Sequence, residues 1–239
     1  MQNAPNPSVA ISPPAQRAAP IAPAWHTIVL LLFIGLASAT SAYSQTLSPL
    51  GFRRGPAFGY MSVILMQWVI VAFICFGLRR RGLTLRELIG GTWPRWTSIL
   101  RDVGIAIVFL IVSGTILAAS AGLLHASNRE VAERLLPHTR ADIAVYLLLC
   151  ATAGFCEEVI FRGYLQKQFS AWTRSATAGL LLQALVFGAG HGYQGPRLMA
   201  VITVFGYLFG LLAQWRRSLR PGMIAHFLQD SSALLVRFR

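Results

Sequence analysis

The sequence predicts an all-α fold, a polytopic bundle of transmembrane helices. Hydrophobic residues make up 55% of the 239 residues and charged residues only 12%, about half the share of a soluble domain. The mean hydropathy is +0.57. Apolar stretches long enough to cross a bilayer recur along the chain, and arginines gather in the gaps between them. We therefore expect about seven spans, or eight if the segment 82–101 also crosses the membrane.

The chain divides into three parts. Residues 1–24 are rich in Pro and Ala and predict a disordered tail. Residues 25–139 predict N-terminal transmembrane helices, with an interfacial segment at 82–101 that mixes tryptophans and arginines. Residues 140–239 hold the remaining helices. The expected spans are about 26–43, 57–78, 102–124, 141–169, 176–191, 198–215 and 221–236.

Positive charges predict the orientation of these spans. If the N-terminal tail is cytoplasmic, that side collects twelve Arg and Lys residues and the other side eight. The small residues Thr40 to Ala42 resemble a signal-peptide cleavage site, but the region before them is long and weakly basic, so we expect a retained span. An arginine-rich chain with a single lysine is typical of a high-GC bacterium, which predicts a multi-pass protein of the bacterial inner membrane.

The net charge of +13 does not indicate a nucleic-acid partner, because the arginines form no basic binding face. Membrane lipid is the expected partner instead. The three cysteines, Cys75, Cys150 and Cys156, lie in apolar stretches without metal-ligand or disulfide spacing. We expect buried structural thiols; a nucleophilic Cys156 beside Glu157 is the alternative.

Two adjacent carboxylates and an arginine lie inside one apolar stretch, at 157–162. Ionisable side chains are costly within a bilayer and usually face a polar interior with a function. Glu158 and Arg162 are four residues apart, so on a helix they share a face and can pair. Glu157 points about 100° away from Glu158 and is free to project into the bundle.

Two later apolar stretches repeat the four-residue spacing, with Phe187 and His191 in one, and His226 and Asp230 in the other. We expect these residues to join the glutamates in one functional site. A glutamate in a low-dielectric site can take a proton from water, and a histidine can donate to a developing oxyanion. Two histidines and carboxylates could equally hold a divalent metal, Zn²⁺, through Glu157, His191, His226 and Asp230.

In this order on hydrophobic helices, these motifs resemble those of the CPBP intramembrane proteases. The motifs are Glu-Glu-x-x-x-Arg at 157–162, Phe-x-x-x-His at 187–191 and His-x-x-x-Asp at 226–230. That family comprises the CAAX prenyl protease 2 (Rce-type), Abi and lysostaphin-resistance-protein-A-like relatives. The resemblance implies an intramembrane endopeptidase whose catalytic domain covers 140–239. The expected substrate is a membrane-associated protein or peptide. Its implied catalytic residues are Glu157, Glu158, Arg162, His191, His226 and Asp230.

Within that resemblance, Glu157 or Glu158 would activate water with His191, while His226 and Asp230 would stabilise the oxyanion. We favour Glu157 as the base, because Arg162 engages Glu158. The resemblance leaves open whether the enzyme is a glutamate protease or a metalloendopeptidase. Many members have Asn where this chain has Asp230, and an ionised Asp cannot donate a hydrogen bond. Asp230 must therefore be protonated, orient His226 or bind a metal.

Two other functions remain as alternatives. One is a non-catalytic membrane scaffold or immunity-type protein with the same fold. The other is a haem electron carrier with His191 and His226 as axial ligands. The sequence does not specify the substrate or the oligomeric state.

Overall fold

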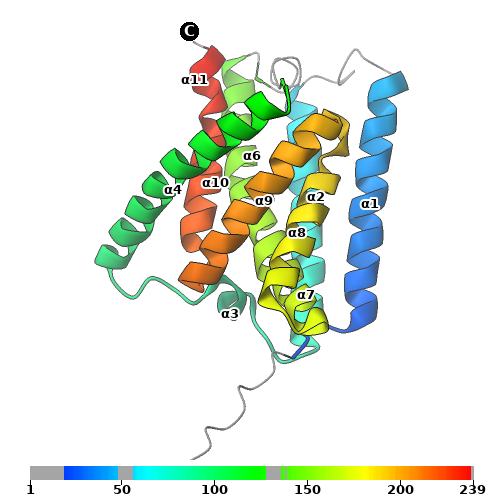
Figure 1. Ribbon diagram of the computed structural model, residues 1–239, viewed down its shortest axis with the longest axis vertical. Helices are drawn as coiled ribbons and strands as arrows, with labels where there is room; N and C mark the ends of the chain where they lie inside the picture. The colour runs from blue at the N-terminus through cyan, green and yellow to red at the C-terminus, as the bar shows by residue number, and fades with distance from the viewer. Residues whose placement is uncertain (1–18, 48–55, 128–135, 138, 238–239) are drawn as a thin grey trace, which may run out of the picture.

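The computed structural model describes residues 19–47, 56–127, 136–137 and 139–237, and Figure 1 shows them as a bundle of helices. Residues 1–18 of the predicted tail lie outside the described residues. No β-strand occurs in the described part of the chain. The α-helices are α1 (Ala24–Leu47), α2 (Pro56–Arg79), α3 (Leu85–Ile89), α4 (Trp96–Leu123), α6 (Arg140–Glu157), α7 (Gln166–Thr173), α8 (Ala176–Gly190), α9 (Pro196–Arg216), α10 (Arg220–Ser231) and α11 (Ala233–Arg237). A π-helix, η1 (Glu158–Leu165), joins α6 to α7, and a 3₁₀ turn, η2 (Gly192–Gln194), joins α8 to α9.

The predicted all-α membrane bundle is confirmed. Five stretches of helix are long and apolar enough to cross a bilayer: Ala24–Tyr43, Pro56–Arg79, Trp96–Leu123, Arg140–Thr173 and Pro196–Arg216. The other two predicted spans appear as α8, with 15 residues, and α10, with 12. Both are shorter than the roughly 20 residues that cross a bilayer. In the bundle α8 packs against α7 and α9, and α10 packs against α4 and α6.

Large apolar side chains cover the outside of the long helices. Leu32, Leu65 and Ile111 are each exposed by about two-thirds (68%, 67% and 67%). In water such continuous apolar surface would promote aggregation. In a bilayer it contacts lipid and carries no free-energy penalty. The outward faces of α1, α2 and α4 therefore fit the hydrocarbon core of a membrane.

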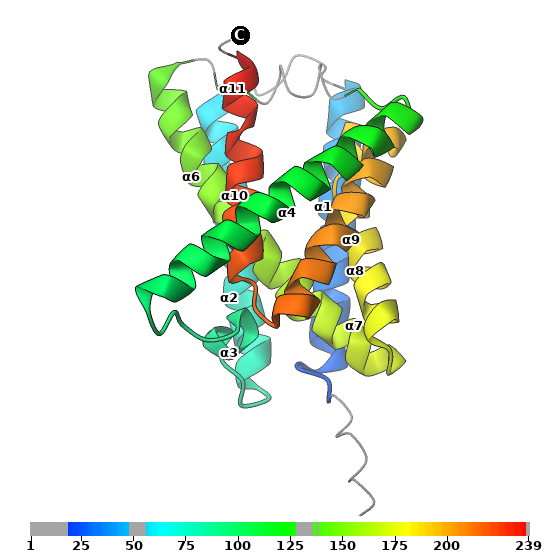
Figure 2. The same ribbon diagram turned by 60° about the vertical axis from the view of Figure 1, so that its left-hand side comes forward.

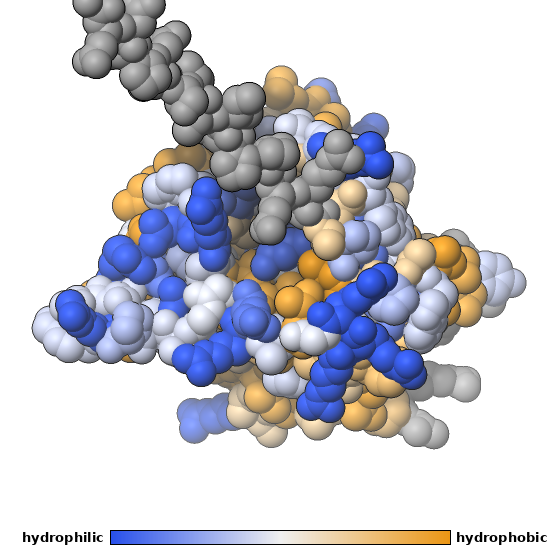
Figure 3. Space-filling view, turned by 90° about the horizontal axis from the view of Figure 1, so that it is seen from below, coloured by the Kyte–Doolittle hydropathy of each residue, from blue (hydrophilic) through white to orange (hydrophobic). Residues whose placement is uncertain are grey.

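Basic residues gather at one end of the bundle, the lower end in Figure 1, where α1, α4 and α10 begin and α2 and α9 end. Arg79 closes α2, Arg216 closes α9 and Arg220 opens α10. Figure 3 views this end and shows hydrophilic side chains across it among apolar ones. The structure thus groups the arginines for which the sequence predicts a cytoplasmic location.

The interfacial segment contributes α3 and the first turns of α4, and no separate span. Thr84 caps α3: its hydroxyl accepts from the Glu87 N–H, and the Glu87 carboxylate accepts from the Thr84 hydroxyl and backbone N–H. These hydrogen bonds hold the pKa of Glu87 below its usual range. A capped helix of this length suits a surface turn rather than a membrane crossing.

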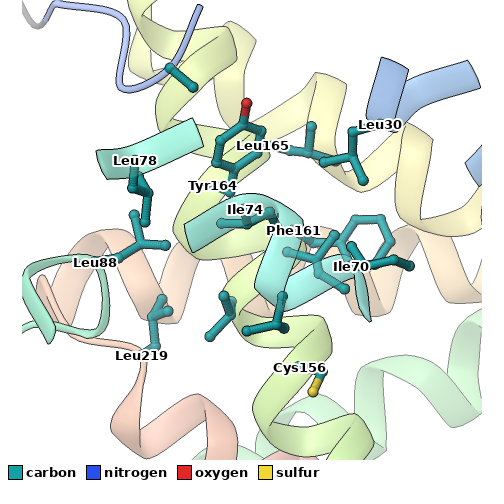
Figure 4. Packing of buried hydrophobic residues seen from close by; sticks show 14 of the residues in the cluster. Leu30, Ile70, Ile74, Leu78, Leu88, Cys156, Phe161, Tyr164, Leu165 and Leu219 are labelled. Atoms are coloured by element: carbon teal, nitrogen blue, oxygen red, sulfur yellow. The ribbon is translucent and has the colours of Figure 1, made fainter. Parts of the chain in front are cut away.

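The apolar core surrounds η1. Figure 4 shows its side chains, among them Cys156, Phe161 and Leu165, packed between Ile70, Ile74 and Leu78 of α2 and Leu30 of α1. Cys156 is fully buried in this core, as expected of a structural thiol. Because every residue of η1 is buried, the segment that carries the carboxylate–arginine motif is also the centre of the packing.

The oblique helix α4 is held by a buried carboxylate at its lower end (Figure 2). Asp102 is 1% exposed and accepts a 2.8 Å hydrogen bond from Trp93 Nε1. Its oxygens lie 3.7 Å from Arg216 Nη2 and 3.4 Å from Arg220 Nε. One carboxylate thus ties α4 to the end of α9 and the start of α10, and so helps to place the helix that carries His226.

Close contact at Gly154 places α6 against α10. A Cβ at Gly154 would lie 2.9 Å from the Met223 carbonyl oxygen and 3.0 Å from the Phe227 nitrogen, which are both backbone atoms. We expect Gly154→Ala to separate the two helices and to cost about 1–3 kcal/mol, the usual range for overpacking. Thermal unfolding in detergent micelles measures this cost.

Gly104 supplies the matched control, because a Cβ there would meet no atom within 4 Å. Gly104→Ala is expected to leave the melting temperature unchanged or to raise it, since Ala is favoured over Gly in helices by about 1 kcal/mol. Equal melting temperatures for the two variants would contradict the tight α6–α10 contact.

Candidate active site

The carboxylate motif lies where the regular helix changes to a π-helix. Glu157 is the last residue of α6, and Glu158 is the first of η1. A π-helix has one more residue per hydrogen-bonded turn than an α-helix and often occurs at functional sites. The sequence predicts a continuous α-helix here; the structure keeps the helix but widens it at the motif.

Glu158 and Arg162 form the ion pair that their spacing predicts. Arg162 Nη1 lies 3.0 Å from Glu158 Oε1, and both side chains are fully buried. The Nη1 atom is poorly aligned for a hydrogen bond, so the pair is held by charge more than by a directed bond. Gly222 leaves room for this carboxylate, since a Cβ there would lie 2.9 Å from Glu158 Oε2.

Aromatic rings enclose the other faces of Arg162. Its guanidinium carbon lies 4.3 Å from the centre of the Phe187 ring, 5.3 Å from Phe209 and 5.9 Å from Phe205. Nη2 also donates to the Gly206 carbonyl at 3.5 Å, close to the limit for a hydrogen bond. A desolvated cation over aromatic faces gains cation–π energy, so α8 and α9 contribute to holding the charge of η1.

His226 lies among three carboxylates. Its Nδ1 is 3.2 Å from Glu158 Oε1, and its Nε2 is 3.7 Å from Glu157 Oε2 and 3.6 Å from Asp230 Oδ2. The residue is 3% exposed. Glu158 therefore orients the ring from one side, while Nε2 faces the other two carboxylates.

Glu157 is the less buried of the two glutamates, with a side chain 16% exposed against 0% for Glu158. Its Oε1 accepts a 2.8 Å hydrogen bond from Nε2 of Gln67 on α2. Its Oε2 is the atom directed toward His226. This arrangement agrees with the geometry expected from the sequence, in which Glu158 pairs with Arg162 and Glu157 projects into the bundle.

His191 lies at the C-terminal end of α8. Its Nδ1 is 2.8 Å from the carbonyl oxygen of Phe187. Because a carbonyl only accepts, Nδ1 carries the proton in this contact and Nε2 is left as the second functional atom. The ring of His191 also lies near the rings of Phe187 and Tyr193, with centres 4.8 Å and 6.0 Å apart.

One cavity of about 610 Å³ joins these residues. Its polar wall includes Glu157, His191, His226 and Asp230, which come from α6, α8 and α10. Its apolar wall comes from α2, α4 and α9, with small residues such as Ala118 facing it. Glu158 and Arg162 lie behind the wall and do not line the cavity. The six predicted residues thus divide into four at the cavity and two that support them.

The structure adds polar residues that the sequence patterns do not indicate. Gln67 reaches Glu157, Tyr146 donates to the Asp230 carbonyl at 3.0 Å, and Tyr193 lines the cavity. The sequence does hold a signal for Gln67, which lies in the middle of an apolar span. Polar side chains are rarely left facing lipid, so a glutamine at this position indicates a side chain that faces the interior of the bundle. The two tyrosines carry no such signal, since tyrosine is common in membrane helices.

Among the described residues no three His, Cys, Asp or Glu side chains are arranged to hold a metal ion. Nδ1 of His226 lies 3.2 Å from Glu158 Oε1, and Nδ1 of His191 lies 2.8 Å from the Phe187 carbonyl oxygen. Each histidine therefore already has a protein partner on Nδ1.

Removal of Arg162 is expected to be the most destabilising change at this site. Arg162→Met leaves Glu158 buried without its cation, and breaking a buried pair from one side typically costs about 3–5 kcal/mol. The double variant Glu158→Gln with Arg162→Met removes both charges and should be more stable than Arg162→Met alone. Melting temperatures of the wild type and the two variants, measured in one detergent, give the order of stability. An equal drop in melting temperature for both variants would contradict the ion pair.

Comparison with known proteins gives a match over the region that carries the motifs. Residues 139–232 match a family model described as type II CAAX prenyl endopeptidase Rce1-like. The range contains both glutamates, Arg162, both histidines and Asp230. Gln67 and the rest of α2 lie outside it.

The chain is also similar to a curated protein of uncharacterized function. The uncharacterized protein YpbD of Bacillus subtilis (strain 168) is 31% identical over 115 residues, which is 46% of this chain and 52% of that protein. The chain therefore spans about half the length of this relative. No solved structure matches the chain. Residues 139–232, which carry the ordered motifs, are therefore similar to the Rce1-like type II CAAX prenyl endopeptidases.

Proposed function

We propose that this chain is an intramembrane endopeptidase that hydrolyses peptide bonds of a membrane-associated protein or peptide. The observation that carries the proposal is the cavity within the bundle, on whose wall Glu157, His191, His226 and Asp230 meet. The endopeptidase family of residues 139–232 supports the same reaction. The protein acts as a multi-pass protein of the bacterial inner membrane, with lipid around it and no nucleic-acid partner.

In the proposed reaction Glu157 is the general base. Its Oε2 takes a proton from water, and the water oxygen attacks the carbonyl carbon of the scissile bond. The carbonyl oxygen becomes an oxyanion and accepts a hydrogen bond from a histidine N–H. When the intermediate collapses, the C–N bond breaks and the proton on Glu157 passes to the leaving amine. Every proton is returned, so the carboxylate is ready for a second cycle.

The contacts of the two glutamates support Glu157 as the base. Glu158 is fully buried, is paired with Arg162 and holds His226 Nδ1. A carboxylate so engaged orients the histidine and has no access to water. Glu157 accepts a hydrogen bond from the neutral Gln67 amide on Oε1, and the residue lines the cavity.

The position of Asp230 supports an orienting role. Its Oδ2 lies 3.6 Å from His226 Nε2, on the ring edge opposite Glu158. A histidine held between carboxylates keeps its plane fixed while its N–H is offered to the oxyanion.

Substitution of the base tests the reaction. Glu157→Gln keeps the shape of the side chain and removes its basicity, so hydrolysis should fall by about 10²–10⁴-fold. His191→Ala and His226→Ala should each reduce it as well. Because the substrate is unidentified, new protein N-termini are mapped by mass spectrometry in membranes of cells that express the wild type or each variant.

Glu87→Gln is the control, since Glu87 is an exposed capping residue on α3. N-termini that appear with the wild type and Glu87→Gln but not with Glu157→Gln would support the protease. The same N-termini from all variants would exclude it. A loss that merely follows the amount of folded protein would indicate the scaffold alternative.

Metal removal provides a separate prediction. The proposed reaction uses no metal, so preincubation of the purified protein with EDTA or 1,10-phenanthroline should leave the cleavage rate unchanged. The rate is measured with a dye–quencher peptide that contains a mapped cleavage site. Inactivation by both chelators, followed by recovery on addition of Zn²⁺, would show that a metal takes part.

A further inference from the structure

Gln67 lies in the middle of α2, outside the segment that matches the family, and its side chain reaches the proposed base. Its Nε2 donates a 2.8 Å hydrogen bond to Glu157 Oε1. The residue is 5% exposed and lines the cavity. We propose that Gln67 is a positioning residue that fixes the carboxylate of Glu157 for proton abstraction. This inference rests on the proposed function and extends the site to the N-terminal half of the chain.

Gln67 makes the two oxygens of Glu157 different. Oε1 is occupied by the amide N–H, whereas Oε2 lies 3.7 Å from His226 Nε2, beyond hydrogen-bond distance. A carboxylate held by one oxygen cannot spin about its last bond without losing that hydrogen bond. Gln67 therefore selects Oε2 as the atom that meets the water, on the side where His226 is placed to meet the oxyanion.

The chemistry of the partner also separates Glu157 from Glu158. Glu158 faces a guanidinium, so its carboxylate is held in an ion pair. Glu157 faces an amide, which carries no net charge and holds the carboxylate by a hydrogen bond. A neutral donor is the better partner for a group that must accept a proton in every cycle.

The amide sits on a rigid support. Two aromatic contacts join α2 to α6 near Gln67. The Trp68 and Phe155 rings stack with centres 5.4 Å apart, and the Tyr60 and Tyr146 rings meet edge-on with centres 5.6 Å apart. Trp68 is the neighbour of Gln67, and Tyr60 lies two turns away along α2. A side chain between two such contacts has little freedom to shift relative to α6.

The same hydrogen bond suits Glu157 throughout the cycle. When Oε2 has taken the proton, Oε1 is a carbonyl oxygen and still accepts from the Gln67 amide N–H. Gln67 therefore fits Glu157 before and after proton transfer.

Gln67→Met tests the proposal, since Met has a similar length and no amide. We expect kcat to fall by about 10–100-fold, the scale of a misplaced catalytic group, while KM stays nearly constant. Gln67→Asn retains the amide but is one methylene shorter, and it should fall between the wild type and Gln67→Met. Rates are measured with the dye–quencher peptide in detergent micelles.

Gln168→Met is the matched control. Gln168 is a fully buried glutamine that binds the backbone of Ile21 and Ala22, and it does not line the cavity. The Gln168→Met substitution should lower the melting temperature and leave kcat unchanged. If Gln67→Met keeps the wild-type kcat, or loses no more than Gln168→Met, Gln67 has no positioning role.

A readout without substrate separates this inference from the proposed function. The carboxylate stretch of Glu157 is identified as the infrared band that disappears in Glu157→Gln. This band should shift in Gln67→Met and stay in place in Gln168→Met. An unshifted band would overturn the inference even if hydrolysis is real. A Glu157→Gln variant that cleaves the peptide at the wild-type rate would overturn Glu157 as the base, whereas full activity of Gln67→Met alongside an inactive Glu157→Gln would overturn only the role of Gln67.

Discussion

The buried ion pair between Glu158 and Arg162 is the interaction on which the rest of the bundle depends. Two full charges lie at the centre of the apolar core, where an unpaired charge would cost several kcal/mol. Each surrounding element compensates part of that cost. Phe187, Phe205 and Phe209 face the guanidinium, Gly206 gives a carbonyl, and His226 faces the carboxylate. The helices that supply these groups are therefore placed by electrostatics as much as by packing.

The pair also explains why the two adjacent glutamates differ. Glu158 is fully enclosed, and its contacts leave it to orient His226. One residue earlier, Glu157 stands at the cavity wall with an amide for its partner. The change of helix type between them assists this division, because residues 158–165 are entirely buried while the preceding turns of α6 still reach the cavity.

Much of this arrangement follows from residue spacing. Apolar stretches predict α2 as 57–78, and the helix is Pro56–Arg79. The four-residue separation of Glu158 and Arg162 predicts their contact, because i and i+4 side chains meet on any regular helix. The π-helix is not predictable in this way, since all of its residues are buried and leave no apolar periodicity to read. The contact between Gln67 and Glu157 is equally hidden, because 90 residues separate them in the sequence and no local rule joins distant helices.

The placement of both charges of the pair on one helix has a consequence for biogenesis. Transmembrane segments enter the bilayer in order of synthesis, and a charged residue at the centre of a span adds about 2.5–3.5 kcal/mol to insertion. Glu158 and Arg162 can neutralise each other inside their own segment, before the helix that carries His226 has been made. Glu157 has no such internal partner, yet α2 precedes it along the chain, so Gln67 is already in the membrane when Glu157 arrives. The order of the helices thus gives Glu157 and Glu158 each a partner at the moment the residue leaves water.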